Sequence, residues 1–353
     1  MTSLPKDIGW IGLGVMGLPM ARNLLQKMDS ETHFYVFDVS ADSMRQLVDE
    51  GQNRVHACSS SKDVADKSNS VVDQPTDVEK DVILSMVPEG SHVRSVYLTE
   101  STSVLGSDLG SKILIDCSTI DTGTSLDVRS ATATQHPKAS FYDAPVSGGA
   151  IGASKATLTF MLGCSTMDLN LPLLTKLLSY MGSNIFPCGG PSLGLTAKLC
   201  NNYCSGLIAI AVSEAMNIGM ASGMDPRVLA NVFHTSTAQS AICDDWCPVP
   251  GICPEAPASK GYQGGFRVQL MKKDFGLAVD TAERVGVKLA LGESGLGVYE
   301  GASADERCRD LDSRVVFRYL GGQEEWRGKF PEEVALKRDE TRALLKKARE
   351  SSK

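Results

Sequence analysis

The first half of the chain alternates between short apolar runs and segments in which apolar residues recur at helical spacing. One apolar run precedes Gly12, and the others occupy residues 34–37, 81–87, 112–117, 139–143 and 157–162. Each run predicts a strand. Segments between them, such as residues 40–50, have the spacing of helices. Unbroken apolar runs separated by helices are typical of a parallel sheet that is buried on both faces. The pattern predicts an α/β fold with an N-terminal, Rossmann-type, doubly wound parallel sheet.

The strand pattern disappears from Leu193 onward. Residues 193–222 form one long helical stretch rich in Ala, Leu, Ile and Met. Asp225 and Pro226 are then suited to cap a second helix and to open it. Further helical patterns cover residues 266–285, 295–304 and 314–320, whereas residues 243–265 are rich in Pro and Gly and are expected to be irregular. We therefore predict an all-α C-terminal domain.

These patterns divide the chain into three parts. Residues 1–190 are assigned to the sheet domain and residues 191–320 to the helical domain. Residues 321–353 are rich in Glu, Lys and Arg, and we expect a solvated helix or a disordered tail, with an oligomer or partner contact as the alternative. The polar residues 68–80 are expected to form a loop insertion.

Composition and charge narrow the possible partners. The 353 residues carry a net charge of −7 with no basic cluster, which argues against nucleic acid and acidic membrane surfaces as partners. No apolar run is expected to approach the roughly 18–20 residues of a membrane-spanning helix. The ten scattered cysteines indicate reduced thiols, and no histidine completes a zinc set beside them, so no metal is predicted. With only six residues before the first expected strand, we expect a cytoplasmic protein.

A glycine motif follows the first apolar run. Gly12 suits a tight strand-to-helix turn, Gly14 lets the backbone approach a pyrophosphate, and Gly17 lets the following helix pack against the strand. Leu13, Val15 and Met16 complete the loop, whose helix N-terminus can hold phosphates. Asp38 ends the next apolar run, about 20 residues further on, which is the spacing of a ribose-binding acid. A carboxylate there repels a 2′-phosphate, so the motif predicts NAD rather than NADP.

Further polar residues stand where a bound ligand is expected. Ser118 and Thr119 follow a predicted strand, and Ser147-Gly148-Gly149 follows another, where successive backbone N–H groups can bind an anion or simply form a turn. Lys198 lies on the apolar face of the long helix with Asn202 one turn later. A buried lysine is suited to acid–base chemistry, and the alternative is a lysine that extends to the helix edge. Lys273 and Lys272 are not distinguished by pattern alone.

Seven short stretches in order make the sequence resemble the β-hydroxyacid dehydrogenase family. They span roughly residues 8–320 and comprise residues 11–17, 115–121, 143–149, 197–202, 248–251, 262–266 and 273–274. The resemblance implies a Rossmann domain followed by a helical domain that binds substrate and mediates assembly as a homodimer or homotetramer. It further implies NAD-dependent oxidation of the primary alcohol of a small 3-hydroxy carboxylate. The expected reaction is oxidation of (S)-3-hydroxyisobutyrate to methylmalonate semialdehyde in valine breakdown.

The resemblance also assigns expected roles by position. Lys198 matches the catalytic lysine, and Asn202 matches the asparagine that helps to place the substrate. Ser147, Gly148 and Gly149 match the loop that binds the substrate carboxylate, and Lys273 matches a lysine that reaches cofactor and substrate. The matches along the cofactor, besides the glycine-rich loop and Asp38, are Val87, Pro88 and Thr119.

Some positions depart from the family pattern and keep alternatives open. His92 stands where the family often has Asn, and Cys247 and Lys260 stand in a loop where similar relatives carry asparagines. Another β-hydroxy acid, such as tartronate semialdehyde or 3-hydroxypropionate, is therefore an alternative substrate, with NAD or NADP. A non-catalytic NAD-binding interaction protein is a second alternative. Eukaryotic members of this type are usually mitochondrial, so the mitochondrial matrix is the alternative compartment.

Overall fold

The computed structural model describes residues 4–68 and 81–330. The predicted insertion therefore lies almost entirely outside the described residues, as does most of the predicted tail. The chain forms two compact units, one up to Cys200 and one from Asn201, and each is described here by itself.

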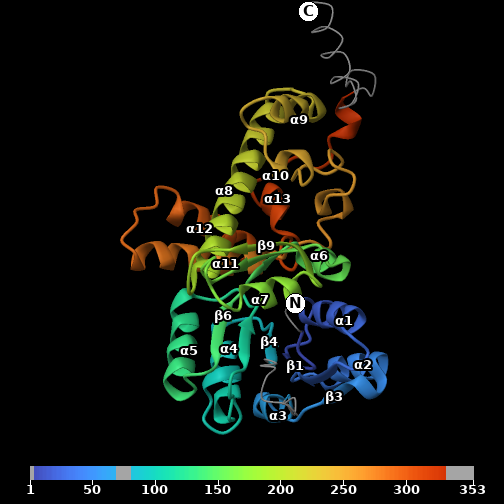
Figure 1. Cartoon of the computed structure of the whole chain (residues 1–353). Coiled ribbons are helices and arrows are strands. Elements are labelled where there is room, and N and C mark those ends of the chain that lie inside the picture. The colour runs from blue at the N-terminus through green and yellow to red at the C-terminus, as the bar shows by residue number, and fades with distance from the viewer. Residues whose placement is uncertain (1–3, 69–80, 331–353) are drawn as a thin grey trace, which may run out of the picture. The chain divides into compact units, whose positions relative to one another are not determined.

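A six-stranded parallel sheet forms the centre of the first unit (Figure 1). The strand order is β3-β2-β1-β4-β5-β6, the order of a Rossmann fold. The predicted α/β fold is thereby confirmed. The strands are β1 (Asp7–Ile11), β2 (His33–Phe37), β3 (Val55–Ala57), β4 (Val82–Ser85), β5 (Ile113–Asp116) and β6 (Ser140–Asp143).

Helices and their apolar side chains cover both faces of this sheet. Alternate residues of a strand point to opposite faces, so Ile113 and Ile115 of β5 join one apolar cluster and Leu114 joins the other. The first cluster includes side chains of α1 (Gly17–Lys27), α2 (Ala41–Gly51), α6 (Gly149–Lys155) and α7 (Leu171–Leu178). The second includes side chains of α3 (Ser61–Lys67), α4 (Gly90–Leu98) and α5 (Thr122–Gln135). Burial on both faces explains why the strands read as unbroken apolar runs.

A second, three-stranded sheet of the first unit was not fully expected. It consists of β7 (Val146–Ser147), β8 (Leu158–Leu162) and β9 (Gly182–Pro187), of which the sequence pattern indicated only β8. The strand β3 was also missed. β3 and β7 are three and two residues long, too short for a periodic signal, and β9 is partly exposed and contains Ser, Asn and Pro. Their pairing partners, rather than their own patterns, make them strands.

The second unit is helical, as predicted. Its helices are α8 (Leu193–Ala221), which begins in the first unit, α9 (Pro226–Thr235), α10 (Ala241–Asp244), α11 (Val268–Arg284), α12 (Gly292–Ala304) and α13 (Val316–Tyr319). Asp225 caps α9 by accepting a hydrogen bond from the Arg227 backbone N–H, and Pro226 opens the helix, as expected. Trp326, in the segment assigned to the tail, is 2% exposed and donates from Nε1 to the Pro250 carbonyl oxygen at 2.9 Å.

One expectation about α8 was wrong. This helix of 29 residues is long and apolar enough, by length and composition, to cross a membrane, and its most apolar 18-residue window has a mean hydropathy of 1.4. In the second unit, Ala209, Val212 and Met216 of α8 belong to an apolar cluster that also contains Phe317 and Trp326. A core helix has the same composition as a membrane-spanning helix because both are surrounded by apolar groups.

Candidate active site

The parallel sheet brings most of the predicted cofactor residues to one edge. Gly12 follows β1, Asp38 follows β2, Val87 follows β4 and Thr119 follows β5. The carboxyl ends of parallel strands share an edge, and in open α/β sheets this edge is where ligands bind. Residues that are widely separated in the sequence therefore meet at this edge.

The three glycines of the loop differ in the space around them. Gly12 has φ +92°, and a Cβ on it would overlap the Met86 carbonyl oxygen. A Cβ on Gly17 would overlap the Gly12 carbonyl oxygen, so this position needs glycine for the turn itself. A Cβ on the exposed Gly14 would meet no atom within 4 Å. The protein therefore does not require glycine at position 14 for its own packing, and the open space fits a pyrophosphate approaching the backbone.

Asp38 is tied to the glycine-rich loop. Its Oδ2 accepts a hydrogen bond from the Leu13 backbone N–H at 2.5 Å, and its Oδ1 accepts one from the Ser40 N–H at 2.7 Å. The side chain is half-buried, at the end of β2. The carboxylate thus links the ends of two adjacent strands.

A buried polar network supports the loops that follow β4 and β5. Oδ1 of Asp116 accepts hydrogen bonds from the hydroxyls of Ser85 (2.7 Å) and Ser118 (2.6 Å). The Ser118 hydroxyl oxygen in turn accepts from the Val87 backbone N–H at 2.9 Å. Burial raises the pKa of Asp116 to about 6, although the hydrogen bonds from Ser118 and Ser85 oppose the rise. The network joins the loops that contain Val87 and Thr119, and the sequence analysis did not single out Asp116.

The Ser147-Gly148-Gly149 segment forms the turn between β7 and α6. Gly148 and Gly149 have φ of +131° and +61°, which only glycine adopts readily. The Ser147 side chain is half-buried and Gly148 is exposed. A Cβ on Gly149 would meet no atom within 4 Å. The segment therefore has the open backbone expected of an anion-binding turn.

Lys198 and Asn202 are both buried on α8, one helical turn apart. Each is 6% exposed, as expected for polar residues on the apolar face of this helix. At the start of α8, the carboxylate of Asp143 accepts hydrogen bonds from the backbone N–H groups of Ser192 (2.7 Å) and Leu195 (2.9 Å). Sequence analysis did not identify Asp143, and its position as the last residue of a buried strand is the signal that was available.

In the second unit, Asn202 is held by a buried acid. Its Nδ2 donates to Oδ2 of Asp274 at 2.6 Å, and Lys273 Nζ lies 3.3 Å from Asp274 Oδ1. Asp274 is 2% exposed. Lys273 is half-buried while Lys272 is exposed, which distinguishes the two lysines that the pattern left equivalent.

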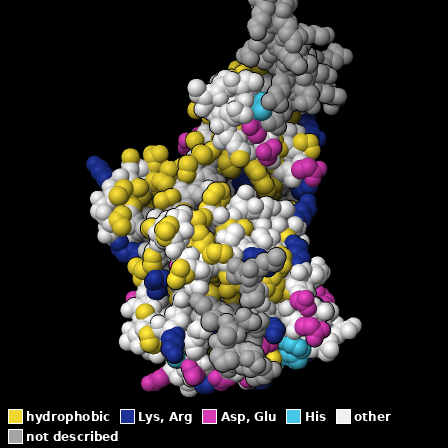
Figure 2. Space-filling model, viewed as in Figure 1, with side chains coloured by type: hydrophobic (Ala, Val, Ile, Leu, Met, Phe, Trp, Pro, Cys, Tyr) yellow, Lys and Arg dark blue, Asp and Glu magenta, His cyan; other side chains and the backbone are white. Residues whose placement is uncertain are grey.

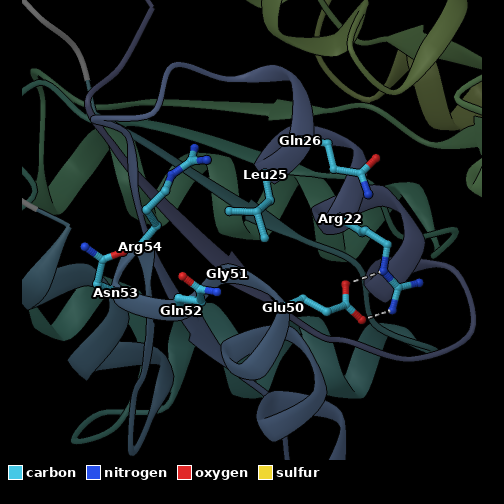
Figure 3. A pocket seen from close by; sticks show the side chains of 8 residues that line it. All are labelled: Arg22, Leu25, Gln26, Glu50, Gly51, Gln52, Asn53 and Arg54. Carbon is cyan, nitrogen blue, oxygen red and sulfur yellow. Dashed lines mark hydrogen bonds and ion pairs between the residues drawn. The ribbon is translucent and has the colours of Figure 1, made fainter.

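A separate pocket of the first unit contains none of the predicted site residues (Figure 3). It is lined by residues of α1 and α2 and by the turn before β3, and its two ion-paired members are Arg22 and Glu50. Because α1 and the turn before β3 both lead into the starts of strands, the pocket lies at the opposite edge of the sheet from Gly12. We assign it no role in the site.

Known proteins resemble this chain along most of its length. Residues 7–190 match the family described as the NAD binding domain of 6-phosphogluconate dehydrogenase. Residues 193–320 match the family described as NAD-binding of NADP-dependent 3-hydroxyisobutyrate dehydrogenase.

Individual relatives agree with these families. A probable mitochondrial 3-hydroxyisobutyrate dehydrogenase of Dictyostelium discoideum is 41% identical over 300 residues, which are 84% of this chain and 86% of the relative. An NAD-dependent L-serine dehydrogenase of Pseudomonas aeruginosa is 34% identical over 294 residues, or 83% of this chain and 91% of that protein. The solved structure of Mycobacterium tuberculosis 3-hydroxyisobutyrate dehydrogenase with L-serine has a TM-score of 0.79 and 30% identity, covering 90% of this chain and 99% of its own.

The cofactor expected from the glycine motif agrees with these matches. The chain is an oxidoreductase that uses NAD and has a Rossmann domain. An enzyme of this kind is not a non-catalytic binding protein, so that alternative is set aside. The chain belongs to the β-hydroxyacid dehydrogenase family and stands close to the 3-hydroxyisobutyrate dehydrogenases.

Proposed function

We propose that this enzyme oxidises (S)-3-hydroxyisobutyrate to methylmalonate semialdehyde with NAD, a step of valine breakdown. The observation that carries the proposal is the buried Lys198 and Asn202 pair on α8, in a chain that is 41% identical to a probable 3-hydroxyisobutyrate dehydrogenase. A lysine and an asparagine one turn apart can hold the same hydroxyl group. A small 3-hydroxy carboxylate offers both that hydroxyl and a carboxylate for the Ser147-Gly148-Gly149 turn.

Each group of the protein has one task in the proposed reaction. The Ser147-Gly148-Gly149 turn binds the carboxylate through its backbone N–H groups and the serine hydroxyl. Asn202 hydrogen-bonds the substrate hydroxyl and orients it toward Lys198. Neutral Lys198 Nζ accepts the hydroxyl proton while the carbon–oxygen bond becomes a carbonyl, and it returns the proton in reduction. The chemistry supplied by bound NAD is acceptance of the hydride from the hydroxymethyl carbon.

The remaining residues are proposed to hold the cofactor. Gly12, Gly14 and Gly17, with Leu13, Val15 and Met16 between them, present the start of α1 to the pyrophosphate. Asp38 accepts hydrogen bonds from the ribose hydroxyls. Val87, Pro88 and Thr119 line the cofactor along the edge of the sheet, and Lys273 of the second unit contacts cofactor and substrate.

L-Serine is the second candidate substrate. It is also a 3-hydroxy carboxylate with a primary alcohol, and a relative 34% identical to this chain is named as an L-serine dehydrogenase. The two substrates differ by an ammonium group in place of a methyl group. An apolar pocket wall therefore favours the first, whereas a carboxylate or carbonyl oxygen near that position favours the second.

The test is NADH or NADPH production by the purified enzyme with (S)-3-hydroxyisobutyrate, L-serine, 3-hydroxypropionate and glycerate, the alcohol that corresponds to tartronate semialdehyde, each with NAD and NADP. We expect the highest kcat/KM for (S)-3-hydroxyisobutyrate with NAD. Higher kcat/KM for another acid keeps the reaction class and replaces the substrate.

The role of Lys198 has its own test. We expect Lys198→Ala to lower kcat by orders of magnitude while NADH affinity stays within about threefold, because the lost proton acceptor acts only in the chemical step. Lys272→Ala, which removes an exposed lysine, is the matched control. Near-normal turnover by Lys198→Ala contradicts the assignment.

We also propose that the enzyme assembles as a homodimer or homotetramer through the second unit. Figure 2 shows hydrophobic side chains gathered over this unit, and on α8 and α9 Ile218, Val228 and Val232 are exposed by 69%, 36% and 46%. Exposed apolar side chains that form a contiguous patch are typical of association surfaces, and we propose that these residues belong to one. Light scattering of Ile218→Glu and Val232→Glu should show a smaller particle than the parent enzyme.

The compartment, cytoplasm or mitochondrial matrix, is tested by imaging the full gene product.

A further inference from the structure

The carboxylate of Asp143 joins the end of a central strand to the start of the helix that carries Lys198. Asp143 is the last residue of β6 and is 2% exposed. Its Oδ1 accepts from the Ser192 N–H at 2.7 Å and its Oδ2 from the Leu195 N–H at 2.9 Å. The first N–H groups of a helix have no carbonyl partner within the helix. One side chain from a distant strand therefore supplies two of the acceptors that α8 lacks.

The surroundings of this carboxylate are tightly packed. A Cβ on Gly163 would overlap its oxygen Oδ1, and a Cβ on Gly194 would lie 2.8 Å from Oδ2. Gly163 also donates its backbone N–H to the Asp143 carbonyl oxygen at 2.7 Å. The lack of a side chain at these two glycines thus makes room for the carboxylate. Burial raises the pKa of Asp143, and the hydrogen bonds from Leu195 and Ser192 oppose the rise.

The backbone at the start of α8 is held in a conformation that is costly by itself. Ser192 has φ +62°, a left-handed value that is uncommon for residues other than glycine. Its N–H donates to Asp143, and its hydroxyl donates to the Thr122 carbonyl oxygen at 3.2 Å. A strained residue persists only where neighbouring groups determine its conformation. Asp143 is one of those groups.

The hydrogen bonds that Asp143 accepts from the start of α8 affect Lys198, because Lys198 follows Leu195 by about one turn of this helix. The rotation of the first turn about the helix axis sets the direction in which a side chain one turn later points. A small error in the direction of a catalytic group lowers the rate of the chemical step far more than it lowers binding.

We propose that Asp143 is a positioning residue for Lys198: by accepting the Ser192 and Leu195 N–H groups it sets the rotation of α8 that aims the lysine amine at the substrate hydroxyl. The inference rests on the proposed role of Lys198. Asp143 itself is sealed from solvent and contacts neither substrate nor cofactor in this assignment.

The test begins with Asp143→Asn, which preserves size but leaves one acceptor, since the amide nitrogen cannot accept from an N–H. We expect kcat to fall about tenfold or more, while the KM values for hydroxy acid and NAD and the Kd for NADH stay within about twofold. Asp225→Asn is the matched control, because Asp225 caps α9 through the Arg227 N–H at 2.8 Å. The control should lower Tm and leave kcat unchanged.

A double-mutant cycle distinguishes positioning of Lys198 from a general loss of structure. Single-turnover NADH formation by Asp143→Asn should be slower than that of the parent enzyme. In the Lys198→Ala background the same substitution should change the rate by less than about twofold, because the side chain it positions is gone. An equal loss in both backgrounds, a parallel loss of NADH affinity, or an unchanged kcat in Asp143→Asn overturns the inference. If Asp143→Asn does not fold, Asp143→Ser, which is neutral and smaller, takes its place in the cycle.

The two proposals fail in different ways. Near-normal turnover by Lys198→Ala removes the proposed catalytic lysine, and with it the target of Asp143. A slow Lys198→Ala enzyme together with an Asp143→Asn enzyme of normal kcat leaves the proposed function in place and overturns only the role of Asp143.

Discussion

Asp38 accepts a hydrogen bond from the backbone N–H of Leu13, with 2.5 Å between Oδ2 and the nitrogen. The residue that we propose selects between NAD and NADP is therefore also a structural part of the glycine-rich loop. Its second oxygen accepts from the Ser40 N–H at 2.7 Å, which orients the carboxylate at the end of β2. If Asp38 also binds the ribose as proposed, its substitution is more damaging than loss of the ribose contacts alone.

The first prediction follows from this double role. Asp38→Ala should weaken NADH binding by about 10- to 100-fold, since hydrogen bonds to charged groups contribute about 1.5–3 kcal/mol. NADPH affinity should not rise to the level of the parent enzyme for NADH, because the loop has lost the acceptor for Leu13. Fluorescence titration measures both values, with Asp42→Ala, whose carboxylate is 88% exposed, as control. Unchanged NADH affinity would show that Asp38 does not contact the cofactor.

The second prediction compares two glycines of the same loop. A Cβ on Gly14 meets nothing within 4 Å, whereas a Cβ on Gly17 overlaps the Gly12 carbonyl oxygen. Gly14→Ala should therefore keep the Tm of the parent enzyme and bind NADH at least tenfold more weakly. Gly17→Ala should lose about 1–3 kcal/mol of unfolding free energy, the usual cost of overpacking. Thermal unfolding and NADH titration of both variants check this, and a Gly14→Ala enzyme with normal NADH affinity contradicts the proposed pyrophosphate contact.

The third prediction concerns Asp116 and pH. Burial raises the pKa of this carboxyl to about 6, so the folded state binds its proton more tightly than the unfolded state, whose pKa is near 3.8. The associated stability is fully present below about pH 4 and is lost as the pH rises through about 6. Asp116→Asn retains an Oδ1 acceptor for Ser85 and Ser118. Its amide does not bind or release a proton over this pH range. The free energy of unfolding of the parent enzyme, relative to this variant, should fall by about 2 kcal/mol between pH 4 and pH 7.5.

Urea unfolding at several pH values measures the difference between the two proteins. Groups that titrate in the same way in both proteins cancel in this comparison. A difference that does not depend on pH would show that Asp116 keeps an ordinary pKa in the folded protein.

The fourth prediction concerns Asn202 and the buried acid that holds it. Asp274 accepts from Asn202 Nδ2 at 2.6 Å, which leaves Asn202 one preferred amide orientation. Asp274→Asn permits the flipped amide, so we expect a KM for the hydroxy acid about tenfold higher and a nearly unchanged KM for NAD. Steady-state kinetics measures both, with Asp280→Asn at an exposed position of α11 as control. Equal KM values for the hydroxy acid in the parent enzyme and Asp274→Asn would contradict a role in orienting Asn202.

The sequence alone predicted those features whose signals are local. Six strands were recognised because buried strands are unbroken apolar runs: β1, β2, β4, β5, β6 and β8. The glycine-rich loop was recognised because its residue types and spacing are confined to a short segment. The family was recognised from seven short stretches. The helical second unit was recognised from its apolar spacing, although we did not expect that α8 is long and apolar enough, by length and composition, to cross a membrane.

Only the tertiary structure decided which of these segments meet. Asp116 accepts a hydrogen bond from Ser85 of another strand, and Asp143 accepts hydrogen bonds from Ser192 and Leu195 at the start of α8. No local sequence pattern encodes such pairs. The short strands β3 and β7 exist because a neighbouring strand pairs with them. Hydrogen bonds between distant residues form only when the chain folds. A sequence therefore predicts which elements carry the chemistry, whereas the folded chain determines what holds each reactive group in place.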